Sequence, residues 1–143
     1  MSRLKRYGLV MATMALLLAV VAACATGSGG EGVPTSGTAQ VDSIDLLMLE
    51  SFPVQISLVV RGSLPDGCTA IDQIAQQRQG DTFKVTITTR RPAGKICTEA
   101  LVPFQESIAL EVAGLPAGAY TVDVNGVTGT FTLDVDNALP ATP

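Results

Sequence analysis

The chain of 143 residues contains no histidine and no tryptophan, and it has only two tyrosines. Without histidine there is no Ser-His-Asp or Cys-His nucleophile, no histidine general base and no histidine-ligated zinc. Tyr7 lies within the first 23 residues, which leaves Tyr120 as the single tyrosine beyond them. Carbohydrate sites and protein interfaces rich in aromatic anchors are therefore disfavoured. We expect no enzymatic activity, no metal and no cofactor.

Basic residues are also scarce, with 9 Lys and Arg against 13 Asp and Glu. Three of the basic residues, and none of the acidic ones, lie in residues 1–23, so the remaining chain carries a formal charge of −7. A surface of this charge repels nucleic acid, and we expect no nucleic-acid partner. The length supports one modest core and is too short for two.

The first 23 residues have the parts of an export signal. A positive segment, residues 2–6, precedes sixteen uncharged residues, 8–23, fewer than the roughly 20 that a membrane-spanning helix needs. The stretch ends in Val21-Ala22-Ala23-Cys24, which resembles the lipobox of bacterial lipoproteins. The resemblance implies cleavage between Ala23 and Cys24, fatty acylation of Cys24 (palmitate among the acyl chains) and attachment to the membrane in the extracytoplasmic cell envelope. An ordinary secretory signal with a chance cysteine, or an uncleaved anchor, are the alternatives.

Three further segments follow the signal peptide. Residues 24–40 comprise the lipidated cysteine and a Gly/Ser-rich stretch without apolar periodicity, which predicts a flexible tether reaching about 20–25 Å. Residues 41–137 are expected to form the folded domain, and residues 138–143 a C-terminal tail. With Cys24 lipidated, Cys68 and Cys97 remain, and in an exported domain they most simply form one structural disulfide. A redox-active or metal-binding pair is the alternative, although there is no C-x-x-C motif.

From residue 41 onward apolar and polar residues alternate with a period of two, as in half-buried strands. The clearest runs cover residues 54–61, 82–88, 108–112, 120–124 and 127–135; residues 43–49 and 69–78 are weaker, and the second also fits a short helical turn. Asn125-Gly126 predicts a two-residue type I′ hairpin with positive φ at both positions. The pattern predicts an all-β sandwich of about seven antiparallel strands.

Residues 115–122, LPAGAYTV, resemble the tyrosine corner of immunoglobulin-like and fibronectin type III-like domains. The resemblance implies such a sandwich, with the Tyr120 hydroxyl bonded to the backbone just upstream. The core tryptophan of the family is missing, and Cys68 and Cys97 do not occupy the positions of the immunoglobulin inter-sheet disulfide. Residues 53–137 also resemble small uncharacterised bacterial secreted domains, which implies no known activity.

The only basic cluster outside the signal peptide is Arg90, Arg91 and Lys95, near Cys97. These residues are a candidate binding loop for an acidic envelope protein or glycan, although a charged loop that discourages edge pairing is the favoured interpretation.

The acidic residues near the last hairpin form a second candidate site. Asp123, Asp134 and Asp136, with Asn137 nearby, carry the oxygen ligands that calcium takes. They lack the spacing and the glycine of an EF-hand loop, so a solvated face is favoured.

Together these features predict a membrane-anchored, non-enzymatic binding or structural module whose ligand is unknown. The alternative is a chagasin-like protease inhibitor on a similar sandwich, because Arg91-Pro92 resembles one loop motif of that family. The motif follows the fourth predicted strand instead of standing between the last two, and the other motifs are missing.

Overall fold

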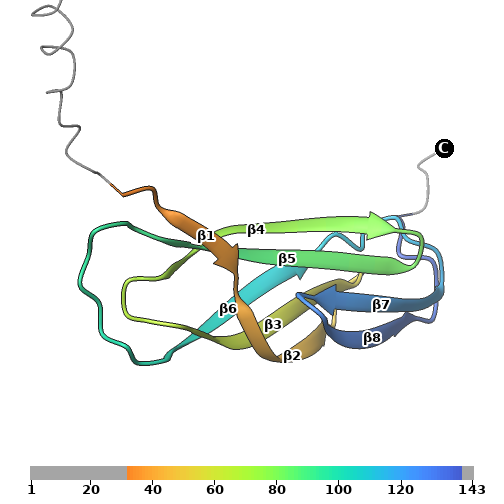
Figure 1. Cartoon of the computed structure of the whole chain (residues 1–143). Helices are drawn as coiled ribbons and strands as arrows, with labels where there is room; N and C mark the ends of the chain where they lie inside the picture. The colour runs from red at the N-terminus through yellow and green to blue at the C-terminus, as the bar shows by residue number, and fades with distance from the viewer. Residues whose placement is uncertain (1–31, 140–143) are drawn as a thin grey trace, which may run out of the picture. The chain divides into compact units, whose positions relative to one another are not determined.

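A computed structural model describes residues 32–139, and these form two β-sheets packed face to face (Figure 1). The predicted signal peptide, the lipidation site at Cys24, the first part of the tether and the last four residues lie outside the described residues. The eight strands are β1 (Thr35–Thr38), β2 (Gln40–Leu49), β3 (Gln55–Leu64), β4 (Ala70–Gln79), β5 (Thr82–Arg91), β6 (Val102–Leu110), β7 (Gly118–Val124) and β8 (Val127–Leu133). The smaller sheet has the order β2-β3-β6, and the larger contains β1, β4, β5, β7 and β8.

The predicted all-β sandwich is confirmed, with eight strands. Both weak runs are strands: β2 contains residues 43–49, and β4 covers residues 70–79, where the helical alternative was wrong. Pairing decides the second case, because β4 runs antiparallel to β5 along its whole length. Among residues 32–139 no helix is long and apolar enough to cross a membrane.

The tether prediction was wrong for residues 35–40. Residues 35–38 form β1, which pairs antiparallel with the end of β5, and β2 begins at Gln40. All four β1 residues are exposed, so the strand is held by backbone pairing alone. Ala39 between the two strands is buried and belongs to the core. The sandwich therefore begins six residues before the predicted boundary at residue 41.

One edge of β5 is shared by two strands. Its first residues pair with β7, in parallel, and its last residues pair with β1. The side chain of Asn125 fills the gap between them, because it accepts from the Ile87 N–H at 3.1 Å and donates to the carbonyls of Ile87 and Ala39 at 2.9 Å. Asn125 and Gly126 have φ values of 48° and 96°, as predicted for the hairpin.

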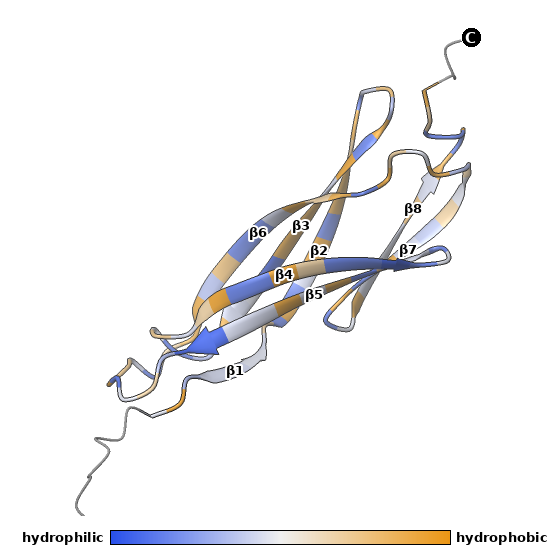
Figure 2. Cartoon of the chain, turned by 90° about the horizontal axis from the view of Figure 1, so that it is seen from above, coloured by the Kyte–Doolittle hydropathy of each residue, from blue (hydrophilic) through white to orange (hydrophobic). Residues whose placement is uncertain are grey.

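The core lies between the sheets and consists of the inward residues of each strand. Figure 2 shows hydrophilic and hydrophobic residues alternating along β4 and β6, the pattern that places one face of a strand inward. Phe83, Tyr120 and Phe131 form an aromatic cluster with ring centroids 5.3–6.1 Å apart. Apart from Asn137, the other fully buried residues are aliphatic and include Ile56, Leu58, Val60, Val85, Ile87, Val122 and Val124.

The two long sides of the sandwich close differently. On one side β2 lies against β8, where a Cβ atom at Gly129 would stand 3.1 Å from the Cδ1 atom of Ile44, so a larger residue would require that side chain to shift. On the other side Gln76 of β4 bridges to β6: its side chain donates to the Ala109 carbonyl at 3.2 Å and accepts from the Glu111 N–H at 3.4 Å. The glutamine therefore satisfies backbone groups at the free edge of β6.

Candidate functional site

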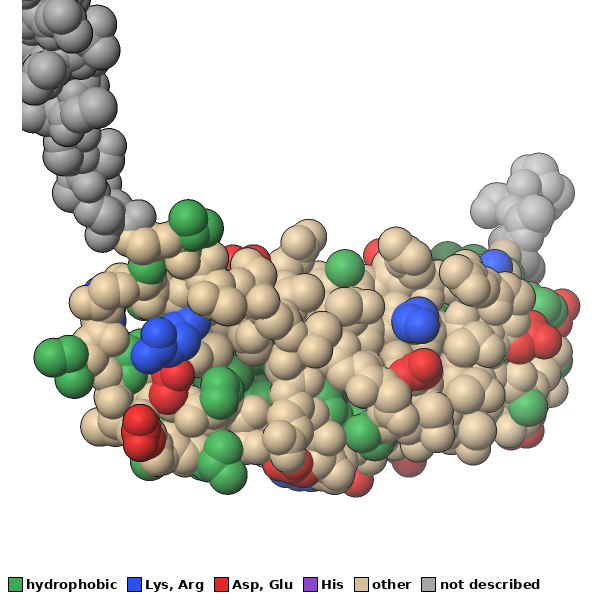
Figure 3. All heavy atoms as spheres, viewed as in Figure 1, with side chains coloured by type: hydrophobic (Ala, Val, Ile, Leu, Met, Phe, Trp, Pro, Cys, Tyr) green, Lys and Arg blue, Asp and Glu red, His purple; other side chains and the backbone are tan. Residues whose placement is uncertain are grey.

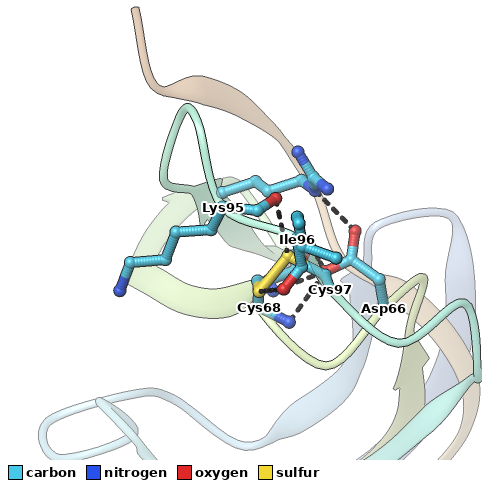
Figure 4. Close-up of polar contacts among 7 residues, drawn as sticks. Asp66, Cys68, Lys95, Ile96 and Cys97 are labelled. Atoms are coloured by element: carbon cyan, nitrogen blue, oxygen red, sulfur yellow. Dashed lines mark hydrogen bonds and ion pairs between the residues drawn. A yellow bond between two sulfur atoms is a disulfide. The ribbon is translucent and has the colours of Figure 1, made fainter. Parts of the chain in front are cut away.

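The disulfide end of the sandwich consists of the loops between β3 and β4 and between β5 and β6, residues 65–69 and 92–101. A disulfide between Cys68 and Cys97 joins them (Figure 4), as predicted. The Gly67 N–H also donates to the Thr98 carbonyl at 3.2 Å. A side chain at Gly67 would come within 2.5 Å of the Thr98 hydroxyl, so glycine lets the loops approach. The disulfide thus fixes a loop of ten residues that has no regular structure of its own.

Asp66 organises this end from the β3–β4 loop. One carboxylate oxygen accepts hydrogen bonds from the N–H groups of Cys68 and Thr69, at 2.9 and 2.8 Å, and from the Thr69 hydroxyl at 3.0 Å. The other accepts from Arg91 Nε at 2.7 Å. One side chain therefore orders its own turn and ties that turn to the end of β5 (Figure 4).

These contacts set the ionisation of Asp66. Partial burial acts to raise the pKa of the carboxyl, but the Arg91 guanidinium and the donors of Cys68 and Thr69 outweigh it and lower the pKa from 3.8 to about 2. Asp66 is therefore ionised at every physiological pH. Its low pKa and its saturated oxygens make it a poor general acid or base.

The predicted basic cluster is only partly assembled. Arg91 is committed to Asp66, whereas Arg90 and Lys95 are exposed and form no ion pair among residues 32–139. Figure 4 shows the Lys95 side chain extending away from Asp66. Two cations at this end are thus available to an external group.

A metal site at the disulfide does not fit the residues present. Ligand atoms of Asp66, Cys68 and Cys97 lie within 4.8 Å of one another. Both sulfurs are bonded to each other and are not thiolates, and the carboxylate already accepts four hydrogen bonds. The cluster is structural.

The acidic residues of the last hairpin serve the backbone instead of converging on an ion. Asp123 accepts from the Gly126 N–H in the hairpin turn, and Asp136 accepts from the Ala117 N–H, both at 2.8 Å. Asp134 is exposed. Asn137 is 1% exposed and points into the protein, so it is not available to a surface ion.

Asn137 organises the opposite end of the sandwich. We call it the hairpin end, after the connection between β2 and β3, and it comprises residues 50–54, 111–117 and 134–137. Its side chain accepts from the Val54 N–H at 2.6 Å and donates to the carbonyls of Val54 and Val112 at 2.9 Å. Its backbone bonds to Gly114 and Leu115 at 2.7 Å. Three chain segments therefore meet on one buried carboxamide.

Tyr120 belongs to the core near this end. Its hydroxyl donates to the carbonyl of Pro116 at 2.8 Å, the contact that a tyrosine corner makes. Its ring is 2% exposed and lies against Phe131, with centroids 5.3 Å apart. The residue is structural and is not available to a ligand.

The organising roles of Asp66, Asn125 and Asn137 were not predicted from the sequence. The signals were present in Pro65-Asp66-Gly67, a turn sequence, and in Asn125-Gly126, whose hairpin was predicted without the role of its side chain. No local pattern marks Asn137, because its partners lie 25 and 83 residues away in the chain.

Comparison with known proteins identifies a β-sandwich family and relatives that are described as uncharacterised. A family model described as the ORF11 beta-sandwich domain matches residues 58–133, from β3 to the end of β8. An uncharacterised 10.2 kDa protein in the HgiCIIM 5′ region of Herpetosiphon aurantiacus is 37% identical over 93 residues, which is 65% of this chain and 98% of that protein. Its counterparts in the HgiBIM and HgiEIM 5′ regions are each 39% identical over 83 residues, 58% of this chain and all of theirs. No solved structure matches the chain.

Proposed function

We propose, from the premise that this chain belongs to the ORF11 beta-sandwich domain family, that it is an exported lipoprotein whose sandwich is a non-enzymatic binding or structural module. Residues 1–23 act as the signal peptide, and Cys24 becomes the acylated first residue of the mature protein. Two or three acyl chains anchor a protein stably where a single chain does not. The protein is then held at the extracytoplasmic surface of the cell envelope.

The observation that carries the proposal is the use of the three cysteines. Cys68 and Cys97 are joined in a disulfide, and structural disulfides belong to oxidising compartments outside the cytoplasm. Cys24 is the one cysteine left. It stands directly after an apolar stretch of signal-peptide length and a lipobox-like sequence, where lipidation requires it.

The non-enzymatic part of the proposal is supported by how the polar groups are used. Asp66, the carboxyl with a lowered pKa, is saturated by four hydrogen bonds. Every fully buried side-chain nitrogen and oxygen in residues 32–139 has a hydrogen-bond partner. Catalytic sites instead hold polar groups poised for substrate.

Metabolic labelling with palmitate tests the anchor. The wild-type chain should incorporate label and partition with membranes, and Cys24→Ala should lose the label. Ser28→Ala, in the same segment, is the matched control and should retain it. Equal labelling of wild type and Cys24→Ala would contradict the proposal. A hydrolase activity abolished by one Asp or Glu substitution would contradict its non-enzymatic part.

A further inference from the structure

The disulfide end carries apolar side chains that the sandwich does not bury. Ile96 is fully exposed at 103%, Val33 is 85% exposed and Leu101 is 69% exposed. Ile96 directly precedes Cys97, so the disulfide fixes its position instead of allowing it to fold back onto the core. Exposed hydrophobic residues also occur at the hairpin end, where Phe52 is 58% and Val135 is 59% exposed. The three residues at the disulfide end are more exposed than these two, and we treat them as a candidate contact surface.

The described chain also begins at this end. Thr35 pairs with Arg91, the last residue of β5. Gly32 lies against Ala93, since a side chain at Gly32 would come within 2.9 Å of it. Pro34 and Pro92 line one shallow hollow together with Cys68. Figure 3 shows hydrophobic side chains at the end of the domain where β1 starts, together with basic and acidic ones.

The length of chain before Gly32 limits how far this end can stand from the lipid. Seven residues lie between Cys24 and Gly32, and the eight residue-to-residue steps span at most about 29 Å when fully extended. The hairpin end lies a strand length farther away, because the ten residues of β3 rise about 33 Å. A lipid at Cys24 therefore keeps the disulfide end within about 29 Å of the membrane at every tilt of the domain, whereas the hairpin end reaches the membrane only when the domain lies flat or inverted.

We propose that Val33, Ile96 and Leu101 insert into the interfacial layer of the membrane that holds the acyl chains, so that the disulfide end docks on lipid. This inference rests on the proposed lipidation of Cys24. Lys95 and Arg90 flank the apolar residues, and their long side chains reach the headgroup level while their stems stay in apolar surroundings. The net charge of −7 outside residues 1–23 opposes binding to anionic lipid, so apolar insertion and not charge attraction drives the contact.

Fluorescence quenching tests the contact, because the chain has no tryptophan and one can be introduced as a single reporter. Full-length protein is purified from its membrane and reconstituted in phosphatidylcholine vesicles whose acyl chains are brominated. Ile96→Trp should lose roughly half of its emission relative to unbrominated vesicles, as expected of a side chain at the headgroup boundary. Phe52→Trp is the matched control: Phe52 is 58% exposed at the hairpin end and should not be quenched.

The outcomes separate this inference from the proposed function. The intact mass of each sample reports whether Cys24 is acylated. Acylated protein in which Ile96→Trp is unquenched, or in which both reporters are quenched equally, overturns the docking and leaves the lipoprotein proposal standing. Protein without acyl chains overturns both. A second variant, Leu101→Trp, should be quenched together with Ile96→Trp, and quenching of neither would show that this end faces water or a protein partner.

Discussion

The two ends of the sandwich hold their connecting segments together by different chemistry. At the disulfide end two loops are joined by a covalent bond and by the charged carboxylate of Asp66. At the hairpin end three segments are joined by the neutral, buried carboxamide of Asn137. The first arrangement is sensitive to redox conditions and acid, and the second to neither. An end exposed to an oxidising exterior can use a bond that would not persist in the cytoplasm.

Removing the disulfide should cause the largest loss of stability. The chain-entropy account gives about 3.6 kcal/mol for a loop of this length. We expect Cys68→Ala/Cys97→Ala to lower the free energy of unfolding by about that amount in urea titrations, and reduction of the wild type to do the same. A loss below about 1 kcal/mol would mean that the loops are ordered without the bond.

Asn137→Ala should come next, at about 3 kcal/mol, because it leaves the N–H and the carbonyl of Val54 without their buried partner and removes one of the two donors to the Val112 carbonyl. The same urea titration measures it. Asp136→Ala is the control, since Asp136 is the exposed neighbour with one hydrogen bond to the Ala117 N–H, and it should cost about 1 kcal/mol or less. Equal losses of unfolding free energy in the two variants would contradict the organising role of Asn137.

Combining the changes at both ends sharpens the comparison. The ends share no contacting residues, so the triple variant Cys68→Ala/Cys97→Ala/Asn137→Ala should lose the sum of the two effects within about 0.5 kcal/mol. Urea titration measures this loss, with all variants made in a stabilised version of the protein in which the triple variant remains folded. A coupling above about 1 kcal/mol would show that the ends communicate through the core.

Tyr120→Phe should have a smaller effect of about 1 kcal/mol, because it removes one part-buried hydrogen bond to the Pro116 carbonyl and leaves the ring packing unchanged. Thermal and urea unfolding check it. An unchanged midpoint would show that the corner is held by ring packing alone.

Asp66→Asn should change mainly the pH dependence of stability. The folded-state pKa of Asp66 is lowered to about 2, below the ordinary value of about 3.9 that it regains on unfolding. Its ionised form therefore stabilises the fold above about pH 4, and that contribution is lost as the pH falls through about 2. Urea midpoints across this window should fall less steeply for Asp66→Asn than for the wild type. Identical slopes would contradict the role assigned to Asp66.

The sequence predicted those parts of the fold that rest on local patterns. Alternation located most of the strands, although β6 begins at Val102, six residues before the predicted run 108–112. Asn125-Gly126 marked the final hairpin, and the cysteine count indicated the disulfide. β1 was not predicted, because Thr35–Thr38 contains no apolar residue and is specified entirely by its partner β5. The parallel pairing of β5 with β7 and the contacts of Asn137 also depend on residues distant in sequence, and a single sequence carries no direct sign of them.

The same limit applies to the candidate site. The positive charge of Arg90, Arg91 and Lys95 was evident in the sequence. The pairing of Arg91 with Asp66 was not, because Asp66 lies 25 residues away. The apolar residues beside the cluster stand out only when their exposure is known. Ile96 and Leu101 read as ordinary loop residues in the sequence and are largely exposed in the fold.

The intact mass of the protein isolated from its own membrane tests the central claim most directly. The account predicts a chain that begins at Cys24, carries acyl groups there and has lost two hydrogens through the bond between Cys68 and Cys97. A chain that begins at Met1, without acyl groups and with three free thiols, would contradict it.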